Sequence, residues 1–207
     1  KIDYIEGGWP GSNPKDEAFF SEVRKLDIQH SKIAAFGSTK RKGLSCKEDP
    51  MMQSLVNSKA DVITLVAKSW DFQVTKALGM ELHENLELIY DSVAYLKDLG
   101  FTVFLDAEHF FDGYKSNSDY SLSCLAKACE AGVDMLVLCD TNGGTLPSEV
   151  FDITRDVASK FSTAVGGHFH NDSGVAVANS MYAIDAGAVS IQGTINGYGE
   201  RCGNCDP

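Results

Sequence analysis

The sequence contains no apolar run close to the roughly 20 residues that a transmembrane helix needs. Its first residues, Lys-Ile-Asp-Tyr-Ile-Glu, are not a signal peptide. Basic residues are scarce, since 18 Lys and Arg stand against 29 Asp and Glu, for a formal net charge of -11. This balance argues against nucleic acid or an anionic membrane as the main partner. We expect a cytoplasmic protein.

An initiator methionine is also lacking, and the chain opens directly in strand-like sequence, so we expect a fragment. Nucleotide-binding signatures are lacking too. There is no P-loop, and Gly197-Tyr-Gly199 has Cys202 where a dinucleotide-binding motif needs its third glycine. The 207 residues, with 43% hydrophobic and 23% charged residues, fit one globular domain.

The six cysteines lack the spacing of a zinc site or a disulfide framework, and we expect them to be reduced. Cys202-Gly-Asn-Cys205 is a single Cys-x-x-Cys. A zinc knuckle needs two more ligands nearby, and a thioredoxin-type motif opens a helix after a strand. Two small residues in a tight loop are the favoured interpretation.

What is present is a repeating unit: a short β-branched run, a polar or glycine turn, and an amphipathic helix. The predicted strands are residues 4–8, 33–37, 62–67, 102–106, 135–139, 163–168 and 189–193. Each is nearly continuous in apolar residues, which is typical of parallel strands covered on both faces. Seven units of roughly 30 residues predict an α/β fold, a (β/α)₈ TIM barrel that is incomplete here. A doubly wound open sheet is the alternative.

Helix signals lie between these strands. Ser12-Asn-Pro-Lys-Asp-Glu17 offers a cap, then a proline in the first turn, then acids at the positive end of the helix dipole. Apolar residues then recur at helical spacing. The stripes are Phe19, Phe20 and Val23; Leu86, Ile89, Val93 and Leu96; Leu122, Leu125 and Cys129; Val150, Ile153 and Val157; and Val177, Met181 and Ile184.

The segment Gly166-Gly-His-Phe-His-Asn-Asp-Ser-Gly174 reads as a strand that ends in a turn. Alternate side chains of a strand share a face, so His168 and His170 point the same way, ~7 Å apart at their α-carbons. Two such imidazoles can hold one divalent metal. By itself, this spacing is equally compatible with a core or loop histidine beside a chance neighbour. The turn and the Gly-rich run 193–204 favour the metal.

Polar residues follow the other predicted strands where a barrel places its chemistry. They are Glu6, Ser38, Lys68, Asp106, Glu108, His109, Asp140, Thr141 and Asn196. Each alone is compatible with a capping or loop role, whereas the whole set predicts a site.

Several of these segments carry a family resemblance. Ile5-Glu-Gly-Gly-Trp-Pro-Gly11, Asp106-Ala-Glu-His-Phe-Phe-Asp-Gly-Tyr114, Leu138-Cys-Asp-Thr-Asn-Gly-Gly144, Gly167-His-Phe-His-Asn-Asp172 and Gly193-Thr-Ile-Asn-Gly-Tyr-Gly-Glu-Arg-Cys-Gly-Asn204 resemble the metal-dependent acyl-CoA condensing enzymes. These include 2-isopropylmalate, homocitrate and citramalate synthases, with hydroxymethylglutaryl-CoA lyase as a relative. The first two segments look most like citramalate synthase. The resemblance spans residues 1–207.

The resemblance implies one partial catalytic domain, strands 2–8 of the barrel, without the first strand. The family's Asp-Thr-Thr-Leu-Arg-Asp-Gly motif, which carries a third metal ligand and an arginine, occurs nowhere in this sequence. The acyl-CoA-binding and regulatory parts that follow the family's barrel are also missing. We therefore expect little activity from these residues alone, and a homodimer for the full-length protein.

The implied reaction is a Claisen-type condensation of acetyl-CoA with a 2-oxo acid, pyruvate for a citramalate synthase, in branched-chain amino-acid biosynthesis. The resemblance implies a divalent cation, Zn²⁺, Mn²⁺ or Mg²⁺, at His168, His170 and Asn204. It implies catalysis by Glu108, with His109 as a proton partner and Glu6 as a supporting acid. The substrate-binding residues would be Thr141, Lys68, Asn196, Glu200 and Arg201. Residues 197–203 would form a mobile loop over the site, or a rigid turn. Asp172 would hold an imidazole or the neighbouring turn, and we favour the turn.

Three alternatives remain. One is a synthase for another 2-oxo acid, such as 2-isopropylmalate or homocitrate synthase. Another is a carbon–carbon lyase, although such relatives carry a cysteine near the position of Ile195 and Asn196. The third is a truncated barrel that acts only as a binding or assembly module. Gln73, where relatives often have His, is expected to alter substrate contacts.

Overall fold

Seven parallel strands form one sheet in unbroken chain order in the computed structural model, which describes residues 2–206. The strands are β1 (Tyr4–Glu6), β2 (Lys32–Ser38), β3 (Val62–Lys68), β4 (Thr102–Glu108), β5 (Met135–Asp140), β6 (Ala164–Phe169) and β7 (Ser190–Gln192). In a doubly wound sheet the strand order reverses at a switch point. The sequential order therefore excludes that alternative.

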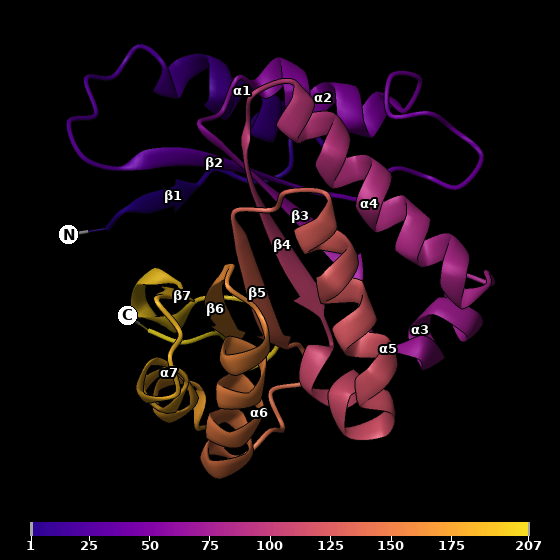
Figure 1. Cartoon of the computed structure of the whole chain (residues 1–207). Helices are drawn as coiled ribbons and strands as arrows, with labels where there is room; N and C mark the ends of the chain where they lie inside the picture. Colours follow the sequence, from indigo (N-terminus) through magenta and orange to yellow (C-terminus); the bar gives the residue numbers. More distant parts are fainter. Residues whose placement is uncertain (1, 207) are drawn as a thin grey trace.

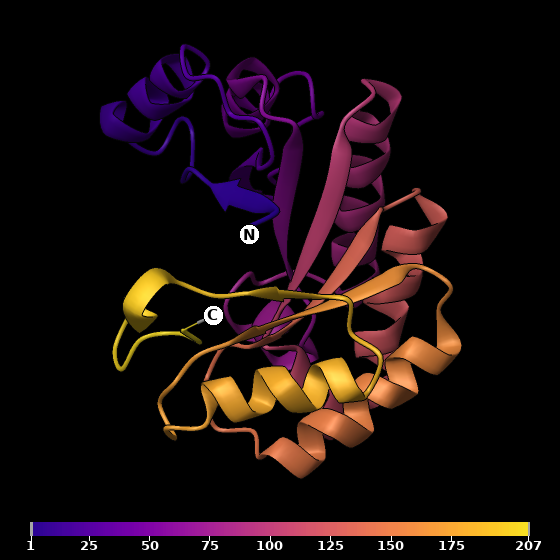
Figure 2. The same ribbon diagram turned by 90° about the vertical axis from the view of Figure 1, so that its left-hand side faces the viewer.

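The helices connect successive strands and cover the convex side of the sheet (Figure 1). They are α1 (Pro14–Val23), α2 (Pro50–Ser58), α3 (Asp71–Lys76), α4 (Leu82–Asp98), α5 (Phe110–Glu130), α6 (Pro147–Lys160) and α7 (Ala176–Asp185), and a 3₁₀ turn, η1 (Ile195–Gly197), follows β7. The sheet curls into a half-barrel. In Figure 2, β1 and the segment after β7 lie on opposite sides of an open face, and no described strand lies between them.

Local signals explain where the helices begin. The side chain of Asn13 accepts a hydrogen bond from the amide of Asp16, and Pro14 occupies the first turn of α1. Glu84 completes a capping box by accepting from the amide of Glu81 before α4. The seven predicted strands are confirmed, with ends that differ by at most two residues.

Two apolar layers flank the sheet. The larger lies between the strands and the helices and includes Ile63, Leu105 and Leu136, all fully buried. The smaller lies on the concave face and contains Ala34, Val62, Phe104, Met135, Val137 and Cys139. Further along β4 on this concave face, Phe104 is followed by Asp106 and then Glu108. The interior thus changes from apolar to acidic towards the carboxyl ends of the strands.

One predicted core stripe is wrong. In α7, Val177, Met181 and Ile184 are 50%, 63% and 54% exposed. The helix instead buries its small residues Ala176, Asn179, Ser180 and Ala183 against β6 and α6. Both sets have helical spacing, and small side chains let the helix approach its neighbours more closely. Hydrophobicity alone pointed to the wrong face.

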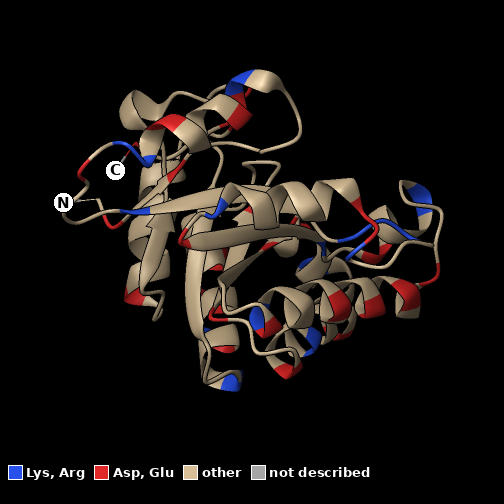
Figure 3. Ribbon diagram, turned by 90° about the horizontal axis from the view of Figure 1, so that it is seen from above, with Lys and Arg blue, Asp and Glu red and all other residues tan. Residues whose placement is uncertain are grey.

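Acidic residues are spread over the outer helices and loops, as Figure 3 shows, in line with the net charge. In the described part of the chain, every helix is too short or too polar to cross a membrane.

The helix-to-sheet core gives a stability prediction. Ile89 is fully buried in α4, whereas its neighbour Tyr90 is 41% exposed. We expect Ile89→Ala to lower the free energy of unfolding by about 2–5 kcal/mol, because a cavity replaces packed methyl groups. Tyr90→Ala, as the matched control, should change it by no more than about 1 kcal/mol. Urea denaturation measures both, and equal losses would contradict this assignment of the buried face.

Candidate active site

The carboxyl ends of the parallel strands bring the predicted site residues to one rim. Lys68 on β3 is in register with Glu108 on β4, and His168 on β6 is in register with Cys139 on β5 and Gln192 on β7. Registered residues of parallel strands share a face of the sheet. These side chains therefore form a row along the concave face, one step beyond Asp106.

His168 and His170 lie together, with ring centroids 5.1 Å apart. An isolated antiparallel bridge joins His170 to Asn204, which brings the end of the chain back beside β6. The amide nitrogen of Asn204 lies 3.0 Å from Nε2 of His168. The three predicted metal-binding residues thus converge, although His170 and Asn204 lie 34 positions apart in the sequence.

This donor set fits a divalent cation. Nδ1 of His170 is buried without a hydrogen-bond partner, and burial, with the charges of His168 and Arg201, lowers the pKa of that imidazole. A neutral imidazole is the form that binds metal. The side chain of Asn204 is cradled by Gly199, where an added Cβ would lie 2.0 Å from Oδ1. Two imidazoles and one amide are a partial set, because no three His, Cys, Asp or Glu residues within residues 2–206 are arranged so that they could hold a metal ion together.

Glu108, the predicted catalytic carboxylate, forms an ion pair with Lys68 on the adjacent strand. Both side chains are about three-quarters buried, with exposed fractions of 23% and 28%. The hydroxyl of Ser69 donates to the backbone carbonyl of Glu108 and fixes the end of β4. Lys68 is thus the counter-ion of Glu108 in this conformation.

His109 caps α5 in a left-handed conformation, with φ of 53°, which is uncommon for a residue with a side chain. Its amide donates to the hydroxyl of Thr141, which lies at the end of β5. Its Nδ1 lies 3.2 Å from the carboxylate of Asp112, which also accepts from Asn142. His109 and Thr141 are therefore held together at the rim by contacts between two loops.

Arg201 joins the C-terminal loop to two strand ends. Its guanidinium binds both carboxylate oxygens of Asp172, at 2.7 and 2.9 Å, and donates to the backbone carbonyl of Thr141 at 2.8 Å. Its hydrogen bonds lower the pKa of Asp172. Asp172 thus binds the distant Arg201 rather than an imidazole. Glu200 is exposed, and Asn196 lies in η1 with φ of 59°.

Two interior acids have raised pKa values. Burial raises the pKa of Asp106 to about 7, partly offset by a hydrogen bond from Gln192. Glu6 lies on the edge strand β1, where part of the residue is exposed. Partial burial of its carboxyl group and the charge of Asp106 raise its pKa to about 7, while His168 opposes the shift.

Sequence reasoning missed Gln192. Its Nε2 donates to Asp106 at 2.9 Å, and its Oε1 lies 2.6 Å from Nδ1 of His168. A signal existed, because Gln192 interrupts a predicted apolar strand. Its partner Asp106 lies 86 residues earlier in the chain, so only the curl of the sheet joins them.

Unpartnered buried polar atoms also gather at this rim. Besides Nδ1 of His170 they include Nε1 of Trp9, Nε1 of Trp70 and Oγ1 of Thr194, each shortly after a strand.

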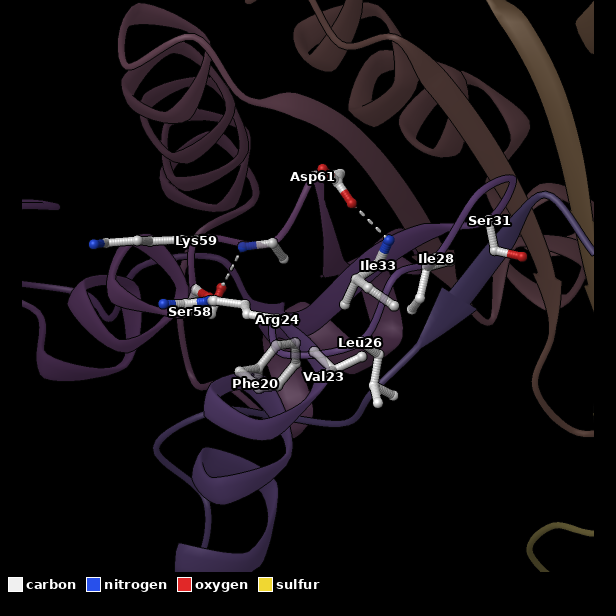
Figure 4. Close-up of a pocket in the computed structure, with 11 residues that line it drawn as sticks. Phe20, Val23, Arg24, Leu26, Ile28, Ser31, Ile33, Ser58, Lys59 and Asp61 are labelled. Carbon is white, nitrogen blue, oxygen red and sulfur yellow. Dashed lines mark hydrogen bonds between the residues drawn. The ribbon is translucent and has the colours of Figure 1, made fainter.

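A cavity of about 190 Å³ lies at the opposite ends of the strands (Figure 4). It is lined by Phe20, Val23 and Ile33, and Asp61 accepts a hydrogen bond there from the amide of Ile33. Barrel chemistry takes place at the carboxyl ends, so this cavity is not the candidate site.

The profile of the HMGL-like family matches residues 1–206. The chain belongs to the HMGL-like family. It is 55% identical over 205 residues to an (R)-citramalate synthase of Sulfolobus acidocaldarius, covering 99% of this chain and 39% of that protein. It is 32% identical over 203 residues to a probable 2-isopropylmalate synthase of Methanopyrus kandleri, covering 98% of this chain and 38% of that protein. The chain thus spans about two-fifths of the length of these curated relatives.

A solved structure supports the fold of this HMGL-like chain. The HMG-CoA lyase of Bacillus subtilis matches with a TM-score of 0.79, covering 99% of this chain and 70% of that chain, at 17% identity. Such low identity speaks to the fold alone. The half-barrel seen here therefore corresponds to part of that larger structure.

The contacts of Arg201 with Asp172 and with the Thr141 carbonyl, here called the Arg201 clamp, give a testable prediction. We expect Arg201→Leu to speed amide hydrogen exchange across residues 197–205, because two side-chain contacts that pin this loop are lost. Glu200→Gln is the matched control, since its 80% exposed carboxylate meets only the guanidinium of Arg201 at 3.5 Å. Unchanged exchange in Arg201→Leu, measured by mass spectrometry, would show that the clamp does not order the loop.

The buried carboxyl of Asp106 gives a pH prediction. Its folded pKa, about 7, lies above the ordinary value of 3.8, so folding favours the protonated form. The resulting penalty is absent below pH 4, grows as the pH rises towards 7 and is complete above it. Asp106→Asn should therefore gain stability relative to wild type at pH 8, by up to a few kcal/mol at about 1.4 kcal/mol per pKa unit.

Denaturation of both proteins at pH 5 and pH 8 measures this difference. An advantage of Asp106→Asn that does not increase with pH would contradict the assignment.

Proposed function

We propose that these residues form part of the catalytic barrel of a citramalate-type synthase, which condenses acetyl-CoA with pyruvate. The observation that carries the proposal is the convergence of His168, His170 and Asn204 at the rim that also holds Glu108. The greater identity to an (R)-citramalate synthase, 55% against 32% to the probable 2-isopropylmalate synthase, favours pyruvate among 2-oxo acids.

We further propose that β1 to β7 are strands 2–8 of the complete barrel. The open face between β1 and β7 supports this, because a further strand there would close the barrel. An additional metal ligand would then come from outside the described residues. Such a barrel would belong to a longer cytoplasmic enzyme that acts as a homodimer.

In this proposal, His168, His170 and Asn204 hold a divalent cation. When bound, the cation supplies Lewis-acid chemistry, polarising the ketone of the 2-oxo acid and stabilising the negative charge that develops on its oxygen. With imidazole and amide donors, Zn²⁺, Mn²⁺ and Mg²⁺ all remain candidates.

Glu108 is the proposed base that takes a proton from the methyl group of acetyl-CoA, and Lys68 balances its charge. His109, held by Asp112, is the proposed proton partner. Attack of the methyl carbon on the ketone forms the new carbon–carbon bond, and water then cleaves the thioester. Glu6 is proposed to add a protonatable group to the interior.

Thr141 is proposed to contact the substrate carboxylate, because its hydroxyl lies at the rim and keeps a hydrogen to donate. Asn196, Glu200 and Arg201 are proposed to border the substrate on the C-terminal loop. Arg201 would do so indirectly, by holding that loop against Asp172.

Thiol release from acetyl-CoA tests the proposal. We expect release with pyruvate and a divalent cation, loss of activity with EDTA, and a decrease in kcat of about 10²–10⁴-fold in Glu108→Gln, because a general base is removed. His168→Ala should abolish activity, whereas His30→Ala, on the surface beside Asp3, should not change it. Release with a different 2-oxo acid, or cleavage of a hydroxyacyl-CoA, would replace this assignment with a related synthase or a lyase.

A further inference from the structure

We propose that Gln192, oriented by Asp106, is a positioning residue that holds His168 in the tautomer with its proton on Nδ1 and the lone pair of Nε2 directed at the metal site. The inference rests on the proposed metal site and extends it to residues on two other strands. Three side chains from β4, β7 and β6 form one hydrogen-bonded chain across the concave face.

The geometry fixes the direction of each hydrogen bond. Nε2 of Gln192 lies 2.9 Å from a carboxylate oxygen of Asp106, which accepts. The opposite orientation of the amide would set its carbonyl oxygen against that carboxylate, so two acceptors would face each other. With Asp106 ionised, Oε1 of Gln192 must therefore face Nδ1 of His168, at 2.6 Å. Nδ1 must then carry the proton.

The far side of the imidazole leads independently to the same tautomer. Nε2 of His168 lies 3.0 Å from the amide nitrogen of Asn204, which can only donate. Nε2 is therefore an acceptor, and its lone pair points towards Asn204. The same lone pair is the one that a cation between these residues would use. Both neighbours of His168 thus agree on where its proton lies.

The surroundings make this chain possible. Gly166 faces the concave side two residues before His168, and a Cβ there would lie 3.2 Å from Met135 Sδ and from the Ser190 carbonyl. The concave face is therefore closely packed beneath the row that holds His168 and Gln192. The contact is also non-local, since Asp106 and Gln192 are separated by three strand positions in the sheet. Ligand-orienting partners of this kind typically change metal affinity by about 10- to 100-fold.

A direct test is Mn²⁺ binding by titration calorimetry at pH 8, where Asp106 is mainly ionised. Gln192→Met keeps the size of the side chain and removes both hydrogen bonds. We expect its affinity for Mn²⁺ to fall about 10- to 100-fold. Gln53→Leu is the matched control, because Gln53 is also half-buried and bonds the Cys46 carbonyl and the Tyr95 hydroxyl rather than a residue of the site, and its affinity should equal that of wild type.

An exchange of the two groups separates positioning from simple packing. In the double variant Asp106→Asn with Gln192→Glu, the new amide donates to the new carboxylate, which accepts from Nδ1 of His168. The hydrogen bond between positions 106 and 192 is then reversed, while an oxygen of residue 192 still accepts from Nδ1 of His168, so we expect Mn²⁺ affinity within a few-fold of wild type. A double variant as weak as Gln192→Met would overturn the inference, because the hydrogen-bond pattern would then not matter.

His168→Ala distinguishes failure of the metal site from failure of the inference. If it loses Mn²⁺ binding and Gln192→Met does not, the site stands and the positioning role is wrong. If His168→Ala binds Mn²⁺ like wild type, the proposed site is wrong. In that case the positioning role is tested without metal, by determining the tautomer of His168 with ¹⁵N NMR of the metal-free protein. Wild type should show the Nδ1–H form and Gln192→Met a mixture, whereas identical spectra would overturn the inference.

Discussion

Parallel pairing in unbroken order is the constraint on which the site depends. It places the carboxyl end of every strand at one rim and fixes which side chains share a row. Lys68 meets Glu108, and His168 meets Gln192, only because their strands are in register. A slip of one residue in either pair would turn one partner to the helix side.

The interior of the half-barrel has an apolar part and a polar part. Phe104 and Met135 form an apolar floor, and Asp106 lies above it at the edge of the polar rim. Burial at this boundary disfavours charge, which explains the raised pKa of Asp106. Burial of this carboxyl group costs stability, and its hydrogen bond from Gln192 offsets part of that cost. Here its partner is Gln192, which connects the boundary to the histidines.

The C-terminal loop brings the remaining parts of the site into place. The bridge between His170 and Asn204 and the contacts of Arg201 fold residues 193–204 back over the end of β6. Glycine is required at two points. A side chain at Gly199 would collide with the side chain of Asn204. Gly203 has a φ of 92°, and a side chain there would collide with the carbonyl oxygen of Gly197. The glycine-rich sequence of this loop therefore follows from close approach of backbone and side chain.

The sequence by itself determined the strands, most of the helices and the convergence of polar strand ends, because these follow from local periodicity and capping. His168 and His170 were also predictable as neighbours, since the alternation of one strand relates them. The buried face of α7 was not predictable, because two stripes of residues have similar helical spacing. Only packing against α6 and β6 decided that the stripe of small side chains is the buried one. Tertiary structure alone decided that Gln192 reaches Asp106 and that Arg201 binds Asp172, because no local rule relates residues 86 or 29 positions apart.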